Sequence, residues 1–548
     1  MRSVPSRRLL AAALALSACA RGSETTSTAS AGGTLVVALP GDADVLLPPV
    51  TSSILSLNIS DRIFPRLAEI GLALNTVDDS GFAPSLARRW EHRDSTTIVF
   101  HLDPRARWQD GPPVTADDVV FTYQVYTDSL VGAPFLPNLA GIASVTKDDS
   151  LTVVFRFRHA YPEQLYDATY HMRIVPKHLL DSIPRARLGS SAFGRRPVGV
   201  GPFRFVRWEA GTEIVLAADP GSFFGRPRLD RIVFRVMPDV SAAVSALIAG
   251  EADAIEVIPQ RDEIERALRA PDLRLLAYPS PFVAGLVFNL RPGRLFADRE
   301  LRRAIAMAVD RETIVRSIFG PYGEVPVGAT SREQWIASND VRQLGFDTLQ
   351  AKRILDDRGW RYASGAGVRL KNGSPLRFTL LVPTTSRIRQ QASVLMQAQL
   401  KALGVDLRIQ PLEFNLFERR TASGDFDVSF FSRTLDPSPA SLLQFWSTAS
   451  IGRDNVGGYA SPGFDSIVTA AIAAPSRAAA APLWRQALER LNEDAAGVFV
   501  YAPRNHAALH RRLENVSIRP DSWLATVAAW SVAPDRRLPR DRIGAAGN

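Results

Sequence analysis

The stretch from Phe100 to Tyr123 reads FHLDPRARWQDGPPVTADDVVFTY and predicts a strand, a turn and a helix in that order. It opens on the end of a short β-rich segment, 97–102 (TIVFHL). The Asp-Gly-Pro-Pro series at 110–113 is typical of a turn. Thr115, with an acidic residue three positions later at Asp118, matches a capping box, and the valines that follow begin an apolar helical face.

The same alternation of strands and helices continues along the chain. Further strands are expected at 34–39, 151–158, 213–217, 232–237 and 498–501. Helices are expected at 241–249, 298–319, 350–358, 391–403 and 479–493. Three of these helices end at a glycine (Gly250, Gly359 and Gly404) that is followed at once by a β-rich segment, which indicates sheets flanked by helices.

The composition is that of an ordinary globular protein, with 548 residues, 46% apolar and 22% charged. This length predicts two or three lobes rather than one core. The formal net charge is +9, but the basic pairs, such as Arg302-Arg303, Arg419-Arg420 and Arg511-Arg512, are scattered rather than gathered in one stripe. We therefore interpret them as solvated helix faces and expect no nucleic-acid partner.

The N-terminus has the pattern of a secretory signal. Arg2, Arg7 and Arg8 precede an apolar run at 9–18, which at roughly ten residues is about half of what a membrane span needs. Leu16-Ser17-Ala18-Cys19 resembles a bacterial lipoprotein lipobox, in which the cysteine is lipidated; the alternative is a plain signal with a chance cysteine. Cys19 is the only cysteine, so no disulfide competes for it.

Catalytic and metal-binding patterns are weak. The sequence has no Gly-x-Ser-x-Gly elbow and no His-Glu-x-x-His motif. His506 and His510 are four apart, as a metal pair on a helix would be, but their segment is polar and basic, and we expect solvent-facing histidines there. The glycines at 199–202 are followed by a strand rather than a helix, which excludes a phosphate-binding loop. We expect no enzyme activity, no metal and no cofactor.

Motifs along most of the chain resemble the family 5 solute-binding proteins of ABC importers, the dipeptide, oligopeptide and nickel type. The quoted stretch carries the family's series of Trp108, Asp110, Gly111, Pro113 and Thr115. The other matching segments are 84–90, 175–178, 197–208 (PVGVGPFRFVRW), 225–239, 250–253, 288–289, 301–315 (LRRAIAMAVDRETIV), 346–360, 400–405, 424–427 and 459–465. Each motif alone is weak, but together they occur in the family's order.

The resemblance implies an α/β fold: a two-lobed periplasmic-binding-protein-like clamshell (class II) with an extra inserted domain and mixed sheets flanked by helices. The implied organisation is a signal peptide (1–18), a flexible tether (19–33), a discontinuous lobe 1 (34–71, 196–278 and 501–535), an inserted domain (72–195), lobe 2 (279–500) and a flexible tail (536–548).

The resemblance also implies where a ligand binds. In peptide-binding relatives an aspartate in the loop after the "G-D-F-D" strand pairs with the ammonium group of the peptide. Counting from Gly424 places Asp436 there, whereas counting back from Pro437 places Arg433 there, and both assignments stay open. Relatives hold the peptide carboxylate with an arginine near position 383, for which Arg387 and Arg389 are the nearby candidates. Trp446 and Asn289 complete the candidate ligand-binding residues.

The function implied is a lipid-anchored extracytoplasmic receptor that binds a peptide or a related small solute between its lobes and delivers it to an ABC permease. Its partners would be the solute, the permease and the membrane, reached through lipidated Cys19. The receptor would act as a monomer in the periplasm or at the cell surface. The alternative is a structural or chaperone-like surface lipoprotein of the same fold with an occluded cleft.

Overall fold

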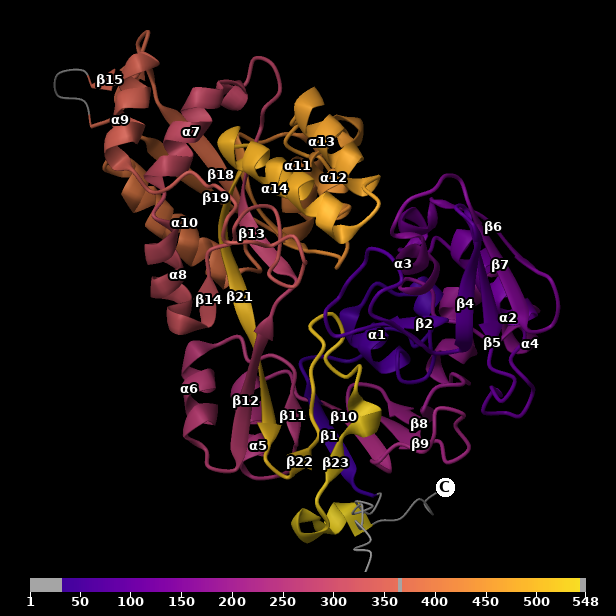
Figure 1. Cartoon of the computed structure of the whole chain (residues 1–548). Coiled ribbons are helices and arrows are strands. Elements are labelled where there is room, and N and C mark those ends of the chain that lie inside the picture. The colour runs from indigo at the N-terminus through magenta and orange to yellow at the C-terminus, as the bar shows by residue number, and fades with distance from the viewer. Residues whose placement is uncertain (1–31, 363–366, 543–548) are drawn as a thin grey trace, which may run out of the picture.

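The computed structural model describes residues 32–362 and 367–542. The signal peptide, Cys19 and most of the predicted tether lie outside the described residues. Figure 1 shows two lobes, one above the other, with a third domain beside them. Gly32 and Gly33, predicted as the end of the tether, belong to the fold, because the Gly32 amide donates to the Arg228 carbonyl at 2.8 Å and the Gly33 amide donates to Asp230 at 3.1 Å.

A mixed sheet of twelve strands runs through both lobes. In lobe 1 its strands are β1 (Thr34–Leu39), β8 (Phe203–Glu209), β9 (Glu213–Ala218), β10 (Arg231–Val236), β11 (Ala254–Ile255) and β12 (Leu273–Pro279). In lobe 2 they are β13 (Phe282–Phe288), β14 (Gly323–Glu324), β18 (Arg377–Pro383), β19 (Asp406–Leu412) and β20 (Val428–Thr434). β1 is parallel to β10 and β11, and β18 is parallel to β19 and β20. The expected α/β class is confirmed.

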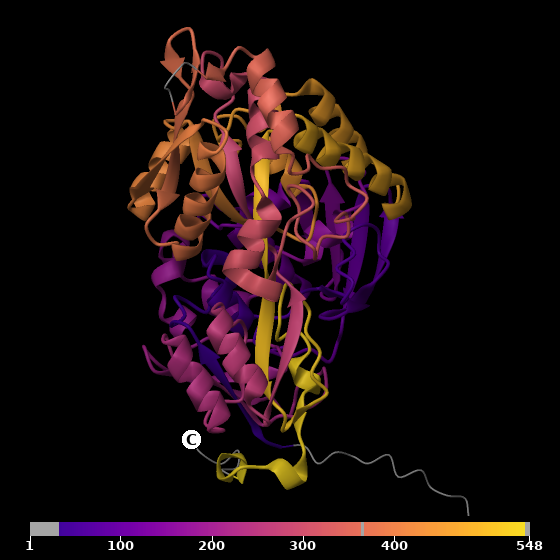
Figure 2. The same cartoon turned by 90° about the vertical axis from the view of Figure 1, so that its left-hand side faces the viewer.

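The twelfth strand, β21 (Gly497–His510), joins the lobes. Its first part pairs with β13 of lobe 2, and its residues from Arg504 onward pair with β12 of lobe 1. The chain crosses between the lobes a second time at Ser280-Pro281, between β12 and β13. β21 is visible as one long yellow strand through both lobes in Figure 1 and in Figure 2. Two adjacent crossings at one place give the molecule its hinge.

The inserted domain holds a separate antiparallel sheet, in the order β4-β5-β7-β6. Its strands are β4 (Ala87–Asp94), β5 (Thr97–Leu102), β6 (Ile142–Lys147) and β7 (Thr152–Phe157), and all four lie between β1 and β8 in the chain. The predicted strand, turn and helix are confirmed as β5, the turn at 110–113 and α2 (Ala116–Thr127), whose capping box forms between Thr115 and Asp118. The domain boundaries themselves stay a prediction.

The helices cover the sheets on both faces. They are α1 (Ile54–Ser60), α5 (Val240–Ile248) and α6 (Arg261–Arg269) in lobe 1, and α2, α3 (Gln164–Thr169) and α4 (Lys177–Leu180) in the inserted domain. Those of lobe 2 are α7 (Arg299–Ala308), α8 (Arg311–Phe319), α9 (Thr348–Asp357), α10 (Arg387–Lys401), α11 (Phe414–Ser423), α12 (Ser441–Trp446), α13 (Pro462–Ile472) and α14 (Arg477–Glu493). In lobe 2, α7–α10 and α11–α14 contribute to two separate cores, one on each face of the sheet. The remaining strands are short: β2 (Ala68–Ile70), β3 (Phe82–Pro84), β15 (Arg361–Tyr362), β16 (Arg369–Lys371), β17 (Ser374–Pro375), β22 (Leu513–Glu514) and β23 (Ser531–Val532).

The helix expected over 298–319 is two helices. α7 ends at Ala308, and its C-cap Val309 has extended backbone angles. α8 begins at once with Asp310 as its N-cap, which accepts the Thr313 amide. The apolar spacing continues across the break because both helices contribute to one core. A new N-cap within an apolar pattern was the available signal of the break.

The glycines at 199 and 201 serve close packing. An added Cβ would lie 2.1 Å from the Ile63 carbonyl oxygen at Gly199 and 2.4 Å from the Arg62 carbonyl oxygen at Gly201. The amides of Val200 and Gly201 both donate to the Ile63 carbonyl. This contact fixes the segment after the inserted domain against the end of α1, so the glycine pattern marks a packing position and not a phosphate site.

The interpretation of the basic pairs as solvated helix faces is wrong for Arg512, and the prediction of a flexible tail is wrong for its described part. Arg512 is buried and lies 2.6 Å from both Asp253 and Asp541. Asp541 also accepts the Thr34 amide at 2.7 Å, so residues 536–542 hold the start of β1. A buried arginine needs such partners, which keeps the tail packed. Arg302 is also buried, and it donates to the carbonyls of Asp494 and Phe296.

Replacing Asp541 with Asn should lower the free energy of unfolding by about 3 kcal/mol, because Arg512 would lose one of two buried counter-charges. The measurement is denaturant-induced unfolding of the variant and the parent. Asp535→Asn is the control, because Asp535 is exposed on the same tail and should leave stability unchanged. Equal stability of the two variants would contradict a structural role for the tail.

Candidate functional site: the cleft between the lobes

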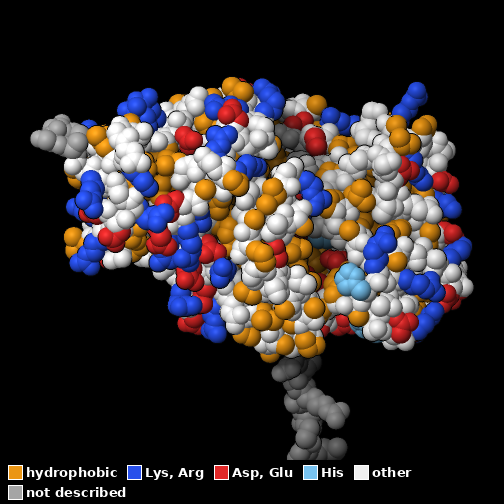
Figure 3. Space-filling model, turned by 90° about the horizontal axis from the view of Figure 1, so that it is seen from above, with side chains coloured by type: hydrophobic (Ala, Val, Ile, Leu, Met, Phe, Trp, Pro, Cys, Tyr) orange, Lys and Arg blue, Asp and Glu red, His pale blue; other side chains and the backbone are white. Residues whose placement is uncertain are grey.

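Lobe 2 meets the inserted domain and the N-terminal segment through polar contacts across a cleft. Tyr166 of α3 donates its hydroxyl to Asp436 Oδ1 at 2.5 Å, and Ser438 Oγ donates to Glu163 Oε2 at 2.6 Å. The Trp335 indole N–H lies 3.3 Å from Thr76 Oγ1. Seen from above, the molecule is hollowed between lobe 2 and the inserted domain, and acidic side chains are visible inside the hollow (Figure 3).

Asp436 lies in this cleft without a cationic partner among the described residues. The loop after β20 presents it, and the Ser438 amide donates to its Oδ1 at 2.9 Å. Burial raises the pKa of Asp436 to about 6, against the hydrogen bonds from Tyr166 and Ser438. His171 Nε2 lies 3.6 Å from Oδ2, but burial, with Arg173 and Arg66 nearby, lowers the pKa of His171 to about 3. The histidine is therefore neutral and does not balance the carboxylate.

Arg433 lies elsewhere. Its guanidinium carbon sits 4.8 Å from the centre of the Phe445 ring, and the side chain lines a cavity of about 30 Å³ inside lobe 2. Trp446 lines the same cavity and is buried against Phe431 and Phe499. Asp436, and not Arg433, therefore contacts the facing domain, and Trp446 belongs to the core of lobe 2.

The other three candidate residues do not join Asp436. Asn289 is fully buried, and its amide donates to the carbonyls of Gly424 and Phe426, so its position fits the fold and not a ligand contact. Arg389 is buried and donates to the Phe430 carbonyl at 3.0 Å. Arg387 is exposed at the start of α10.

Both lobes line a second cavity, of about 300 Å³, beside the hinge. Ile258 and Arg261 contribute from lobe 1, and Phe282, Ser386 and Ile388 contribute from lobe 2. The start of α10 therefore reaches the junction of the lobes, although Arg387 itself is not among the lining residues. This cavity leaves open space between the lobes at the hinge, and it shares no lining residue with the part of the cleft around Asp436.

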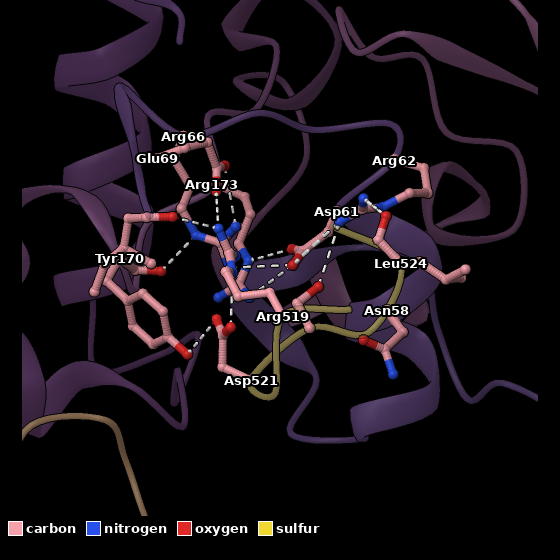
Figure 4. A network of polar contacts seen from close by, with 12 residues as sticks. Asn58, Asp61, Arg62, Arg66, Glu69, Tyr170, Arg173, Arg519, Asp521 and Leu524 are labelled. Atoms are coloured by element: carbon pink, nitrogen blue, oxygen red, sulfur yellow. Dashed lines mark hydrogen bonds and ion pairs between the residues drawn. The ribbon is translucent and has the colours of Figure 1, made fainter. Parts of the chain in front are cut away.

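A buried ion network underlies the cleft on the side of lobe 1 (Figure 4). Asp61 accepts from Arg173 at 2.7 Å and from Arg66 at 3.1 Å. Arg519 donates to Asp521 at 2.7 Å and lies 3.1 Å from Glu69. The Tyr170 hydroxyl reaches Asp521 at 3.0 Å. The network thus ties the N-terminal segment, the inserted domain and the C-terminal segment together.

Charge balance sets the protonation of the network. Burial alone would raise the pKa of Asp61, but Arg173 and Arg66 hold that pKa well below its usual range. Burial lowers the pKa of Arg62 to about 10, against the attraction of Asp61. Arg62 remains charged at neutral pH, and its guanidinium donates to the Leu524 carbonyl. The arginines of this network pair with acids of the same network. Among the described residues, none of them forms an ion pair with Asp436 or Glu333.

The family is shown by a model of the bacterial extracellular solute-binding proteins, family 5, which matches residues 81–453. This chain belongs to that family.

Similar proteins span the same length as this family 5 protein. The oligopeptide-binding protein AppA of Bacillus subtilis is 28% identical over 538 residues, covering 96% of this chain and 97% of AppA. The solved structure of AppA in complex with a nonapeptide superposes with a TM-score of 0.76 at 27% identity, over 92% of this chain and 99% of that one. A probable di/tripeptide-binding protein of Pseudomonas aeruginosa is 25% identical, covering 86% of this chain and 90% of the relative.

The family 5 fold explains why several cleft residues could not be found from the sequence. Glu163, Tyr166 and Glu333 carry no motif, and Tyr166 is 270 positions from Asp436. A hydrogen bond between residues so far apart in the sequence forms only because lobe 2 packs against the inserted domain, and no local pattern predicts it. His506 was expected to face solvent, but it lies on β21, buried, with its ring 5.0 Å from that of Tyr322.

Among the helices described in residues 32–362 and 367–542, none is long and apolar enough to cross a membrane. The same residues contain no group of three or more His, Cys, Asp or Glu side chains arranged to hold a metal ion.

Replacing Asp61 with Asn should lower the free energy of unfolding at pH 7 by about 3–5 kcal/mol, because Arg66 and Arg173 would be left buried without their counter-charge. The pKa of Asp61 is depressed in the folded protein, so its contribution is complete above the unfolded pKa near 4 and is lost as the pH falls toward the folded value. The gap between parent and variant should therefore narrow below pH 4.

Unfolding midpoints in denaturant, measured from pH 2.5 to 7, would test this dependence. Asp357→Asn is the matched control, because Asp357 is exposed at the end of α9. A constant gap at every pH would refute the assignment of Asp61 as the charge that holds the network.

Proposed function

We propose that this protein is an extracytoplasmic receptor that encloses peptides between its lobes and delivers them to an ABC importer. The observation that carries the proposal is the junction made of β21 and the Ser280-Pro281 crossing beside a cleft that contains Asp436, a partly buried acid without a Lys or Arg partner among the described residues. Full-length similarity to AppA, an oligopeptide-binding protein, supports a peptide as the ligand.

Asp436 is the group that takes the ammonium of the peptide. The family pattern places an aspartate in this loop for that role, and Asp436 lies in the cleft whereas Arg433 lies inside lobe 2. The raised pKa of Asp436 means that a bound ammonium stabilises the ionised form by direct pairing. At neutral pH a carboxyl group with this pKa is mostly ionised, so a ligand cation pairs with a charge that burial makes unfavourable.

Closure of lobe 2 on the inserted domain is stabilised by hydrogen bonds that join the two walls of the cleft. The Tyr166 and Ser438 hydroxyls reach across the cleft to Asp436 and Glu163, respectively. A peptide that fills the gap adds its own contacts to both walls, so it favours the closed state by as much as it prefers that state over the open one. The closed shape is the signal that a permease can recognise.

The remaining parts of the proposal come from the sequence. Lipidation of Cys19 would hold the receptor at a membrane surface in the periplasm or outside the cell, and the receptor would act as a monomer. Family members are solute-binding proteins, so we propose that the peptide leaves unaltered. Incubation with peptides followed by mass spectrometry should recover them intact, and cleaved products would point to a hydrolase.

Adding a nonapeptide at 100 times its dissociation constant should stabilise the purified mature protein by about 2.7 kcal/mol. Thermal unfolding with and without peptide measures the shift, and small-angle X-ray scattering should show a smaller radius of gyration for the liganded protein. The absence of any response to a broad peptide mixture would instead favour a structural or chaperone-like surface lipoprotein.

Replacing Asp436 with Asn should weaken binding of a peptide with a free N-terminus by at least about tenfold, because a buried charge pair loses one partner. Calorimetric titration measures the change. Binding of the N-acetylated peptide should be the same in both proteins. Asp425→Asn, on an exposed acid of the same lobe, is the control. Equal loss with both peptides would contradict the ammonium role.

A further inference from the structure

Glu333 lies where lobe 2 meets the rest of the molecule. It belongs to the long connection between β14 and α9, and the two residues that follow it contact the cleft. The Gln334 side chain donates to the carbonyls of Asp436 at 2.8 Å and Ser438 at 3.1 Å. The Trp335 indole reaches Thr76 of the N-terminal segment. The segment is therefore fixed against the loop that presents Asp436.

The carboxylate of Glu333 is buried and unpartnered. The residue is 7% exposed, and neither carboxylate oxygen has a hydrogen-bond partner among the described residues. The adjacent Arg332 does not neutralise it, since its guanidinium lies 3.4 Å from Glu324 and donates to Asn339 at 2.7 Å. Burying a carboxyl group without hydrogen bonds costs free energy, so Glu333 is retained at the expense of stability.

Glu333 interacts electrostatically with groups on both sides of the lobe boundary. Burial raises the pKa of Glu333 well above its usual range, and Asp521 and Asp436 raise it further. Glu333 in turn contributes to the raised pKa of Tyr278 on β12, after burial and Glu256. Asp521 and Tyr278 belong to the part of the chain opposite lobe 2. Glu333 therefore lies near the boundary between the lobes, as do Gln334 and Trp335, which follow it and contact the Asp436 loop and Thr76.

Asp253, a buried acid that stabilises the fold, has the cationic partners that Glu333 lacks among the described residues. Asp253 is fully buried, lies 2.6 Å from Arg512 and 2.7 Å from Arg540, and accepts the Val36 amide at 2.8 Å. Arg519 is already paired with Asp521 and Glu69, and Arg477 lies over the Trp335 ring at 5.1 Å. Nothing comparable serves Glu333, so a role in holding the fold together does not account for it.

The cleft as a whole has an excess of acids. Glu163, Glu256, Glu333 and Asp436 are four acids at the cleft that form no ion pair with Lys or Arg within the described part of the chain. Burial raises the pKa of Glu163 and that of Glu256 to about 7. Acids with raised pKa values are partly protonated in the empty cleft and ionise beside a cation, so such a lining favours a ligand that brings positive charge with it.

We propose that Glu333 binds a cationic side chain of the bound peptide, that of Lys or Arg, at a position separate from the terminal ammonium taken by Asp436. The inference rests on the proposed function, because it assigns a ligand preference to the same cleft. The preferred cargo is then a basic peptide. The unpartnered oxygens of Glu333 gain their hydrogen bonds only when that peptide is enclosed.

The test is a set of nonapeptides with a free N-terminus that carry either Lys or norleucine, its uncharged analogue, at one position scanned along the chain. With the mature protein, Lys should bind about tenfold more tightly than norleucine at one position, the difference expected for one charge-assisted hydrogen-bonded pair. In Glu333→Gln that preference should fall below about threefold, while the loss on N-acetylation stays as in the parent. Glu312→Gln, an exposed acid of α8, should keep the preference.

The unliganded protein supplies a second measurement. Because Glu333 has no partner before peptide binds, Glu333→Gln should melt at the same temperature as the parent or higher. A lower melting temperature would reveal a structural role and overturn the inference. So would a Lys preference that survives in Glu333→Gln, or a loss of the N-acetylation effect in that variant.

The outcomes separate the two proposals. If nonapeptides bind the parent protein with no Lys preference at any position, the role of Glu333 is wrong and the peptide receptor stands. If no nonapeptide binds, the proposed function fails and the role of Glu333 fails with it.

Discussion

The arrangement of the molecule depends on the ion network around Asp61. A single carboxylate at the end of α1 holds Arg66 and Arg173, and Arg519 extends the same network to Asp521 and Glu69. These residues come from the N-terminal segment, the inserted domain and the C-terminal segment, so the network fixes three distant parts of the chain at one place. The network contains four buried arginines and three acids: Arg62, Arg66, Arg173 and Arg519 with Asp61, Glu69 and Asp521. Removing any one acid would leave a buried arginine without its counter-charge, which is strongly destabilising. The inserted domain is thereby held to lobe 1 and moves with it.

In the described part of the chain the two lobes are joined by only two crossings, which is where a rotation of one lobe against the other is expected. β21 belongs to both lobes, and its pairing partner changes from β13 to β12 around Pro503. The continuous strand keeps the lobes in register while the residues between the two pairings absorb a rotation. The polar contacts from Tyr166 and Ser438 then lie at the far edge from the hinge, where a small rotation produces the largest change in distance.

Much of this fold could be predicted from the sequence, and the cleft could not. The capping box at Thr115, the Asp-Gly-Pro-Pro turn and the ordered family motifs identified the elements because each is a local signal. Asp436 was found because its loop has a family counterpart, but only tertiary structure separates it from Arg433, which lies three residues earlier and inside lobe 2. Arg512 and Asp541 were assigned to solvent because a buried ion pair between them leaves no pattern in composition. Glu333 has no local signal at all.

The two kinds of buried acid in this protein indicate a division of tasks. Asp61 and Asp253 are paired with arginines and stabilise the folded chain in every state of the cleft. Within residues 32–362 and 367–542, Asp436 and Glu333 have no such cation, and we propose that the closed cleft gains stability when a ligand brings positive charge. An internal arginine in the cleft would make closure favourable without cargo and would hide the difference between empty and loaded receptor. Leaving the acids unpaired therefore couples closure to the ligand, which is the property that a receptor for a transporter requires.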